Sequence, residues 1–194
     1  MILEEHAYRT LVVSSSAKLT DALRPMLVSA HCDPITTAES ISQAKRLTME
    51  NQYDFVIVNA PLPDDFGTKF ALDVSDGKST VCLLLVRAEA YEQIRPKAIA
   101  HGVFVLSRPT SAAVMAHALD FLTSARERLR RLEKKTVSIE EKMEEIRLVN
   151  RAKWLLIENL KMTEPDAHRY IEKEAMNTCV SKREIAESII ETYV

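Results

Sequence analysis

Polar residues that could perform chemistry are scattered along this chain. The most suggestive run is Ser14 to Ser16, in which a hydroxyl group could act as a nucleophile. A nucleophilic serine needs a neighbouring general base, and the sequence identifies none. A turn that joins a strand to a helix is the ordinary interpretation of three serines in a row. We therefore expect no catalytic residues and no enzyme activity.

Cysteine and histidine residues also form no recognisable site. Cys32, Cys82 and Cys179 lie far apart, and the five histidines are equally scattered. No group of them has the spacing of zinc ligands, and no glycine-rich phosphate-binding motif occurs. An odd, scattered set of cysteines is typical of reduced thiols in the cytoplasm. We expect a cytoplasmic protein with no metal ion, cofactor, signal peptide or membrane span.

The overall charge is almost balanced. Hydrophobic residues make up 46% of the 194 residues, and the formal net charge is -2. This balance argues against a uniformly basic nucleic-acid binder. Contact with a nucleic acid would therefore need a local basic face.

Residue composition changes near residue 110, which predicts a domain boundary there. All three glycines lie in the first 102 residues, and six of the seven prolines lie at or before Pro109. After that point almost every residue favours a helix. We predict a first domain over residues 1–110, a linker helix over 111–146 and a helical domain over 147–194.

The first domain alternates short apolar runs with amphipathic segments. The apolar runs predict buried strands at 10–13, 55–58, 81–86 and 103–106, with a weaker one near 35–37. Helices are predicted between them at 18–29, 40–49, 68–74 and 91–100. Continuously apolar strands that alternate with helices indicate a parallel sheet covered on both faces. The pattern predicts a doubly wound α/β domain with a five-stranded sheet in the order 2-1-3-4-5.

The second part opens with a candidate helix over residues 111–160 that carries a heptad pattern. Its core positions follow one another at alternating spacings of three and four, and all but one are apolar. They are Leu122, Ala125, Leu129, Leu132, Thr136, Ile139, Met143 and Ile146. A pattern of this length favours a dimeric coiled coil. The alternative is an amphipathic helix that packs on its own domain.

Two shorter helices are predicted after the long one, at about 165–177 and 182–192. Thr163 is the expected N-cap of the first, and Ser181 with Glu184 forms a capping box at the second. Together with the end of the long helix they make a small three-helix domain. Such a small unit has a thin core, so its fusion to a coil would help to hold it.

A set of short segments occurs in fixed order, without a gap, in this last part of the chain. They are Arg151-Ala152-Lys153, Thr163 to Asp166, Ala167, Ala175-Met176-Asn177 and Glu184-Ile185-Ala186. Over residues 146–190 the sequence thereby resembles the ANTAR domain, the RNA-binding module of bacterial transcription antitermination regulators. The resemblance implies a dimer that binds paired stem-loops in messenger leaders, where the bound hairpin forms at the expense of a terminator.

Two residues depart from the pattern of that family. Trp154 stands where a glycine or another small residue is usual, and His168 stands where an aromatic residue is common. Buried aromatic residues usually belong to a core, which is the favoured interpretation of Trp154. A face on which RNA bases stack is the alternative.

The residues expected to contact RNA are the cations of this domain, with one histidine that could stack on a base. From Arg147 onward the chain has eight basic and eight acidic residues, so charge alone favours ordinary solvated faces. The resemblance favours RNA contact instead. The candidates are Arg151, Lys153, His168, Arg169 and Lys173.

Residues 9–110 resemble the receiver domain of response regulators, with its reactive residues replaced. The two acids that hold Mg²⁺ in a receiver align with Ser14 and Ser15, and the phosphoryl-accepting aspartate aligns with Asn59. The hydroxyl residue aligns with Val86 and the lysine with Arg108.

These replacements remove the chemistry of phosphoryl transfer. Serine hydroxyls are poor ligands for a hard divalent cation, and asparagine has no nucleophilic carboxylate. Asp64 and Asp65 lie just beyond Asn59, where exposed turn acids are the ordinary interpretation. We expect a pseudo-receiver with no site of aspartyl phosphorylation.

The sequence thus predicts a homodimeric, RNA-binding antitermination regulator whose partner is a structured mRNA leader. The alternative is an interaction protein in which the sheet domain and the coil dock a partner and RNA binding is lost. The signal that controls the protein in place of phosphorylation is left open by the sequence. It could be a sensor protein, a small ligand in the degenerate pocket or the expression level alone. The target operon, and whether the dimer is constitutive, are not encoded in any recognisable way.

Overall fold

The computed structural model describes residues 7–77 and 79–193, which fall into two compact units. One unit extends to Arg131, and the other begins at Leu132. Helix α5, Ala112–Leu160, supplies residues to both units. Among the described residues, no helix is both long enough and apolar enough to cross a membrane.

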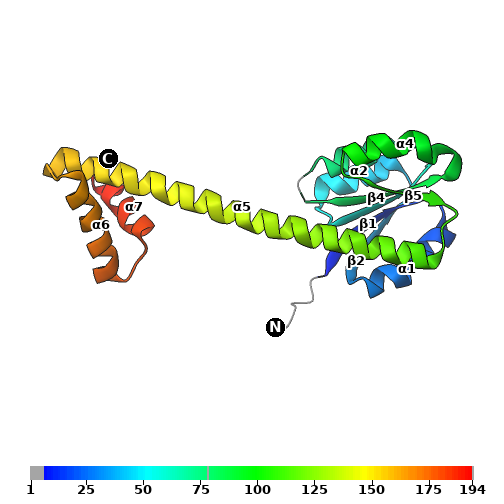
Figure 1. Ribbon diagram of the computed structural model, residues 1–194, viewed down its shortest axis with the longest axis horizontal. Coiled ribbons are helices and arrows are strands. Elements are labelled where there is room, and N and C mark those ends of the chain that lie inside the picture. Colours follow the sequence, from blue (N-terminus) through cyan, green and yellow to red (C-terminus); the bar gives the residue numbers. More distant parts are fainter. Residues whose placement is uncertain (1–6, 78, 194) are drawn as a thin grey trace. The chain divides into compact units, whose positions relative to one another are not determined.

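The first unit is built on a parallel sheet (Figure 1). In the described part of the chain its five strands are β1 (Tyr8–Val13), β2 (Cys32–Ala38), β3 (Phe55–Asn59), β4 (Val81–Arg87) and β5 (Phe104–Arg108). They pair in the order β2-β1-β3-β4-β5, and every pair is parallel. The predicted sheet and its strand order are confirmed. The weakly predicted second strand is longer than expected.

Helices cover both faces of this sheet. They are α1 (Ala17–Ser29), α2 (Ile41–Glu50), α3 (Thr68–Ser75) and α4 (Ala88–Ala100), together with the start of α5. Since successive side chains of a strand point to opposite faces, β3 supplies Val56 and Val58 to one core and Phe55 and Ile57 to the other. Helices α2, α3 and α4 cover the first core, and α1 and α5 cover the second. Burial on both faces explains why the strands are continuously apolar.

The first part of α5 belongs to the sheet unit, which corrects the prediction for the start of the coil. Leu122 is 0% exposed inside the core that α1 also covers, and Ala125 and Leu129 pack against that core. A side chain buried within its own unit cannot line a seam between two chains. Leu122 therefore realises the alternative of an amphipathic helix that packs on its own domain, and Ala125 and Leu129, which are partly buried, pack on the same core.

Two polar contacts also fix this part of α5 to the sheet. The Nε of Arg126 donates to Oδ1 of Asp54 at 2.8 Å, and the hydroxyl of Tyr8 donates to Oε1 of Glu127 at 2.8 Å. Burial and the bond to Glu127 raise the pKa of Tyr8 to about 12. The boundary that composition places at residue 110 thus lies at Arg131, because the sheet needs these residues of α5 to cover its second face.

The coil positions from Leu132 onward are exposed. Leu132, Ile139, Met143 and Ile146 form what we call the exposed apolar stripe, all on α5. Thr136 lies between them, and its hydroxyl donates to the backbone oxygen of Leu132 at 3.0 Å. For these residues the dimeric coil stays a prediction.

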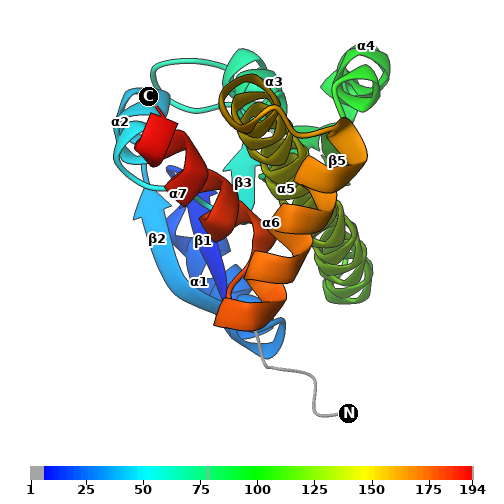
Figure 2. The same cartoon turned by 90° about the vertical axis from the view of Figure 1, so that its left-hand side faces the viewer.

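The second unit comprises the end of α5, α6 (Glu164–Thr178) and α7 (Lys182–Tyr193). Figures 1 and 2 show α6 and α7 beside the C-terminal end of α5. The core consists of small and branched residues: Ala152, Leu156, Ala167, Ile171, Ala186 and Ile189. Alanine at three of these positions lets the helices approach closely. The backbone nitrogens of Asp166 and Glu184 donate to the hydroxyls of Thr163 and Ser181, at 3.3 and 3.2 Å. Thr163 thus caps α6 as predicted, and Ser181 makes its bond of the predicted capping box.

Asp64 caps the N-terminal end of helix α2, so it is more than an exposed residue of a turn. Its two carboxylate oxygens accept bonds from the backbone nitrogens of Ile41 and Ser42, at 2.9 Å each. These bonds lower the pKa of Asp64 to about 2, and the bond from Ile41 has the largest effect. The carboxylate therefore stabilises the folded state most when it is ionised.

Replacing Leu122 by alanine is expected to lower the free energy of unfolding of the first unit by roughly 2–5 kcal/mol, because a cavity opens in a packed core. The control is Phe121→Ala at the next position, which removes a larger but exposed side chain. This change is expected to cost no more than about 1 kcal/mol. Urea unfolding followed by circular dichroism measures both. Equal losses would contradict the placement of Leu122 in the core.

Replacing Asp64 by asparagine is expected to lower the melting temperature at pH 7 and to matter less in acid. A carboxyl whose pKa is lowered by folding stabilises the fold above its unfolded pKa of about 4, and this contribution disappears as the pH falls toward 2. Thermal unfolding between pH 7 and 2 measures the difference from wild type. Asp73→Asn, the same change at an exposed position of α3, serves as the control. A difference that stays constant over this range would argue against the cap.

Candidate functional site

The cations predicted to contact RNA are separated by the structure into exposed and engaged groups. Arg151 on α5 and Arg169 and Lys173 on α6 are exposed. The spacing of Arg169 and Lys173 puts them on one side of α6, away from the face that buries Ala167 and Ile171. These three cations are free to meet a polyanion at the surface of the second unit.

Lys153 is engaged within the protein. Its Nζ lies 2.7 Å from Oε1 of Glu164 at the start of α6, and its side chain is only 16% exposed. This bond lowers the pKa of the Glu164 carboxyl. Lys153 therefore ties α5 to α6, and its charge is largely balanced before any ligand arrives.

His168 also has a partner. Its Nε2 lies 3.4 Å from Oε1 of Glu172, which also accepts a bond from the amino group of Lys182 at 2.5 Å. Lys182, followed by His168, lowers the pKa of the Glu172 carboxyl. This cluster joins α6 to the start of α7.

A basic groove of about 340 Å³ brings Lys153 and His168 together in the second unit. It is lined by Lys142, Glu145, Ile146, Val149, Asn150, Lys153, His168 and Lys182. Lys142 and Lys182 are cations of this groove that sequence reasoning did not include among the RNA contacts. The signal was weak, because neither forms a pair of cations four residues apart on one helix.

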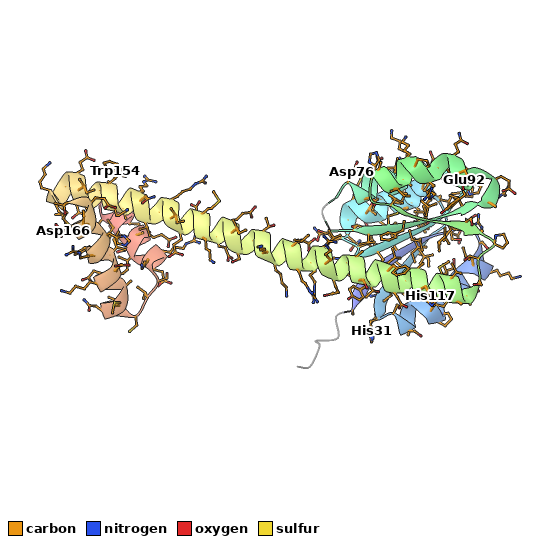
Figure 3. The ribbon with its side chains drawn as sticks, viewed as in Figure 1. His31, Asp76, Glu92, His117, Trp154 and Asp166 are labelled. Carbon is orange, nitrogen blue, oxygen red and sulfur yellow. The ribbon has the colours of Figure 1, made fainter. Side chains whose placement is uncertain are left out.

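Trp154 is exposed, so the favoured interpretation of a core residue is wrong. Its side chain is 70% exposed, and Figure 3 shows it at the surface of α5. Arg147, Asn150 and Arg151 precede it by seven, four and three residues, which places them on the same side of the helix. We call these four residues the Trp154 face. The missed signal was the spacing of Arg147, Arg151 and Trp154 itself.

The Trp154 face combines the two groups with which proteins bind unpaired nucleotides. An indole ring offers a flat surface on which a base stacks, and guanidinium groups meet phosphates. Arg147 has only a long contact to Glu144, 3.8 Å between Nη1 and Oε2, and both side chains are well exposed. Such a surface pair contributes little stability and can exchange for a phosphate.

A different set of predicted positions meets at the carboxyl ends of the strands in the first unit. Asn59 at the end of β3 donates from Nδ2 to the hydroxyl of Ser14 at 2.9 Å, and both side chains are buried. Val86 is buried at the same edge, and Ser15 is exposed. The guanidinium of Arg108 donates to the backbone oxygen of Ala60.

These residues do not fit a magnesium ion. Mg²⁺ is held in proteins by carboxylate oxygens, and here the positions supply two hydroxyls and an amide whose nitrogen already binds one of them. Within residues 7–77 and 79–193, no group of three histidine, cysteine or acidic side chains is placed to hold a metal ion. The arrangement resembles a receiver in position and differs from it in chemistry.

Comparison with known proteins finds a likeness for both parts of the chain. The family model described as the ANTAR domain matches residues 138–190, so the match begins within the segment predicted as coil. The chain is 25% identical over 184 residues to the transcriptional regulatory protein PdtaR of Mycobacterium tuberculosis, covering 95% of this chain and 90% of that protein.

Solved structures establish the fold of the first part. The signal receiver domain of an HD domain-containing protein from Pseudomonas fluorescens has a TM-score of 0.58 at 22% identity, covering 68% of this chain and 96% of that one. An adenylate cyclase structure from Rhodopirellula baltica has a TM-score of 0.59 at 17% identity, covering 70% of this chain and 98% of that one. At these identities the likeness concerns the fold alone. Residues 138–190 thus match the ANTAR domain, most of the chain is similar to a transcriptional regulatory protein, and the N-terminal part has the receiver fold.

Proposed function

We propose that this protein is an RNA-binding transcription antitermination regulator that acts as a homodimer. Each C-terminal domain of the dimer binds one of two adjacent stem-loops in an mRNA leader, and the bound hairpin forms in place of a terminator. The proposal rests mainly on one observation. The ANTAR match at 138–190 falls on the unit that carries the Trp154 face.

RNA recognition is assigned to exposed groups rather than to bulk charge. Structured RNA is read mainly through its shape and through unpaired loop bases, so one stacking ring and a few cations can form a specific contact. Trp154 stacks on a loop base, and Arg147 and Arg151 bind the flanking phosphates. Arg169 and Lys173 on α6 add a second set of phosphate contacts.

Lys153 and His168 have a supporting part in this proposal. Each is already bonded to a carboxylate of its own unit, Glu164 and Glu172 respectively. A phosphate would have to displace these carboxylates to reach them. They hold α6 in place against α5, and the RNA contacts lie on the exposed side chains.

Dimer formation is assigned to the exposed apolar stripe. Exposed apolar residues that repeat at spacings of three and four on one helix are covered when two such helices pair. In a parallel dimer Lys135 attracts Glu140 of the second chain, whereas Lys142 faces Arg147. Each such exposed pair is worth only a few tenths of a kcal/mol, so the apolar side chains supply most of the association energy.

The regulator works without aspartyl phosphorylation. Asn59 stands at the position of the phosphoryl acceptor and has no carboxylate that could attack a phosphorus atom. Val86 offers no hydroxyl to a phosphoryl oxygen, and the hydroxyl of Ser14 is bonded to Asn59. These features support control by another signal.

The first test is to recover and sequence the RNA that the full-length protein retains from total bacterial RNA. Leaders with two adjacent hairpins that overlap a terminator are expected. Trp154→Ala is then expected to weaken binding of a recovered leader roughly 5- to 150-fold, the range for loss of one stacked base. Trp154→Phe is expected to retain most of the affinity.

The melting temperature separates this prediction from a structural effect. Because Trp154 is 70% exposed, Trp154→Ala is expected to leave the melting temperature almost unchanged. Arg147→Glu with Arg151→Glu is expected to abolish retention, and Arg95→Glu with Lys97→Glu, the same change of charge on α4, is the control. No enrichment from a folded protein, or equal loss in both double variants, would favour a regulator that docks a partner protein instead.

The coil is tested by one apolar-to-charged change within the stripe and one beside it. Ile139→Lys is expected to convert dimers to monomers, and Val137→Lys on the same helix is expected to leave the mass unchanged. Light scattering measures the mass. Affinity for a two-hairpin RNA is expected to fall about 100-fold or more in the first variant, while single-hairpin affinity stays the same. Equal behaviour of the two variants would reject the stripe as the dimer seam.

A further inference from the structure

The carboxyl edge of the sheet in the first unit carries an open pocket of about 740 Å³. It lies beside the ends of β1, β3, β4 and β5 and the start of α1. Its lining residues are Ser15, Ser16, Lys18, Leu19, Ala22, Asn59, Pro61, Leu85, Arg87, Arg108, Pro109, Thr110 and Met115. We call it the edge pocket. Ligands of doubly wound sheets bind at this edge, where the order of the strands reverses.

The edge pocket is positively charged, whereas a metal site in a protein is lined by negatively charged groups. Lys18, Arg87 and Arg108 are its charged lining residues, and no carboxylate belongs to the lining. In the part of the chain that the structure describes, none of these three cations forms an ion pair with an acid. A pocket with several cations and no counter-charge attracts an anion.

Two of the cations stand next to each other because of the register of the sheet. Arg87 at the end of β4 is the pairing partner of Arg108 at the end of β5. Burial, and then the charge of Arg87, lowers the pKa of Arg108. Like charges at this spacing repel each other, and a shared anion would turn the repulsion into attraction.

Two buried polar atoms at the same place lack a hydrogen-bond partner. One is Oδ1 of Asn59, whose side chain is 4% exposed, and the other is Nε of Arg108. A buried polar atom without a partner costs free energy, so each marks a place where a ligand can supply the missing bond. Arg108 requires an acceptor, and Oδ1 of Asn59 requires a donor such as a hydroxyl group.

We propose that the edge pocket binds a phosphate group, with Arg87, Arg108 and Lys18 around the phosphate oxygens and Asn59 accepting a bond from a hydroxyl of the ligand. Arginine suits this task because its planar fork binds phosphate through two bonds at once. The first turn of α1 adds the partial positive charge of a helix start. The phosphate belongs either to a small phosphorylated metabolite or to free inorganic phosphate. Binding there does not depend on RNA.

Calorimetric titration of the full-length protein with ribose 5-phosphate, inorganic phosphate and ribose tests this proposal. At least one phosphate-bearing probe is expected to bind at one site per chain, and ribose alone is expected to give no heat. Tighter binding of ribose 5-phosphate would identify a phosphorylated metabolite as the ligand, because the hydroxyls reach Asn59. Tighter binding of inorganic phosphate would identify the free anion.

Substitutions locate the binding at the edge pocket. Arg87→Gln is expected to weaken binding about tenfold or more, because one bond to a charged group is lost. Asn59→Asp has nearly the same shape, adds a negative charge and is expected to weaken it further. Arg95→Gln, an exposed arginine of α4 outside the pocket, is expected to bind as wild type does.

Two outcomes would overturn the proposal. One is the absence of saturable heat with both phosphate-bearing probes. The other is binding that Arg87→Gln and Asn59→Asp leave unchanged, or that Arg95→Gln weakens equally. Circular dichroism confirms that each variant is folded. Trp154→Ala is expected to bind the probes normally, so failure of the RNA proposal and failure of this one are distinguishable.

Discussion

Helix α5 has to satisfy two different surroundings with one apolar spacing. Up to Arg131 its apolar side chains cover one face of a sheet that would otherwise be open to water, with Leu122 at the centre of that contact. Beyond Arg131 the same spacing continues where no sheet lies against it, and the side chains are exposed. The residues of α5 before Arg131 complete the second core of the sheet. Those after Arg131 leave the exposed apolar stripe open to a partner. A single uninterrupted helix can do this because side chains three and four residues apart lie on the same side of it.

At the carboxyl edge of the sheet the backbone fold is that of a receiver, whereas the side chains are chemically different. The backbone places the ends of β1, β3, β4 and β5 next to one another whatever side chains they carry. In this chain hydroxyls and an amide stand where a receiver carries acids, and the paired residues Arg87 and Arg108 lie at the same edge. The sign of the local charge is thereby reversed, which changes the class of ligand that the edge can attract.

The sequence was sufficient to predict the sheet, because strands buried on both faces read as continuous apolar runs whatever surrounds them. The sequence does not show where the buried part of α5 ends and its exposed part begins. Apolar residues at spacings of three and four occur both in a coiled coil and in a helix that packs on a sheet. Leu122 and Ile139 are both core positions of the heptad, yet Leu122 is buried and Ile139 is exposed. The exposure of Trp154 does not follow from its residue type, because the general preference of aromatic residues for a core says nothing about which side of one helix is covered. The pairing of Arg87 with Arg108 depends on the register of two strands, which local sequence does not contain.

The bond between Asn59 and Ser14 has a consequence for the thermodynamics of the N-terminal unit. Where several carboxylates crowd one edge of a sheet, their mutual repulsion is relieved when a divalent cation binds, so the stability of the fold is linked to the concentration of that cation. Here the equivalent contact is a neutral hydrogen bond of 2.9 Å between two buried side chains. Such a contact is insensitive to metal supply and to chelators. We therefore expect this contact to add no magnesium dependence to the free energy of folding of the unit.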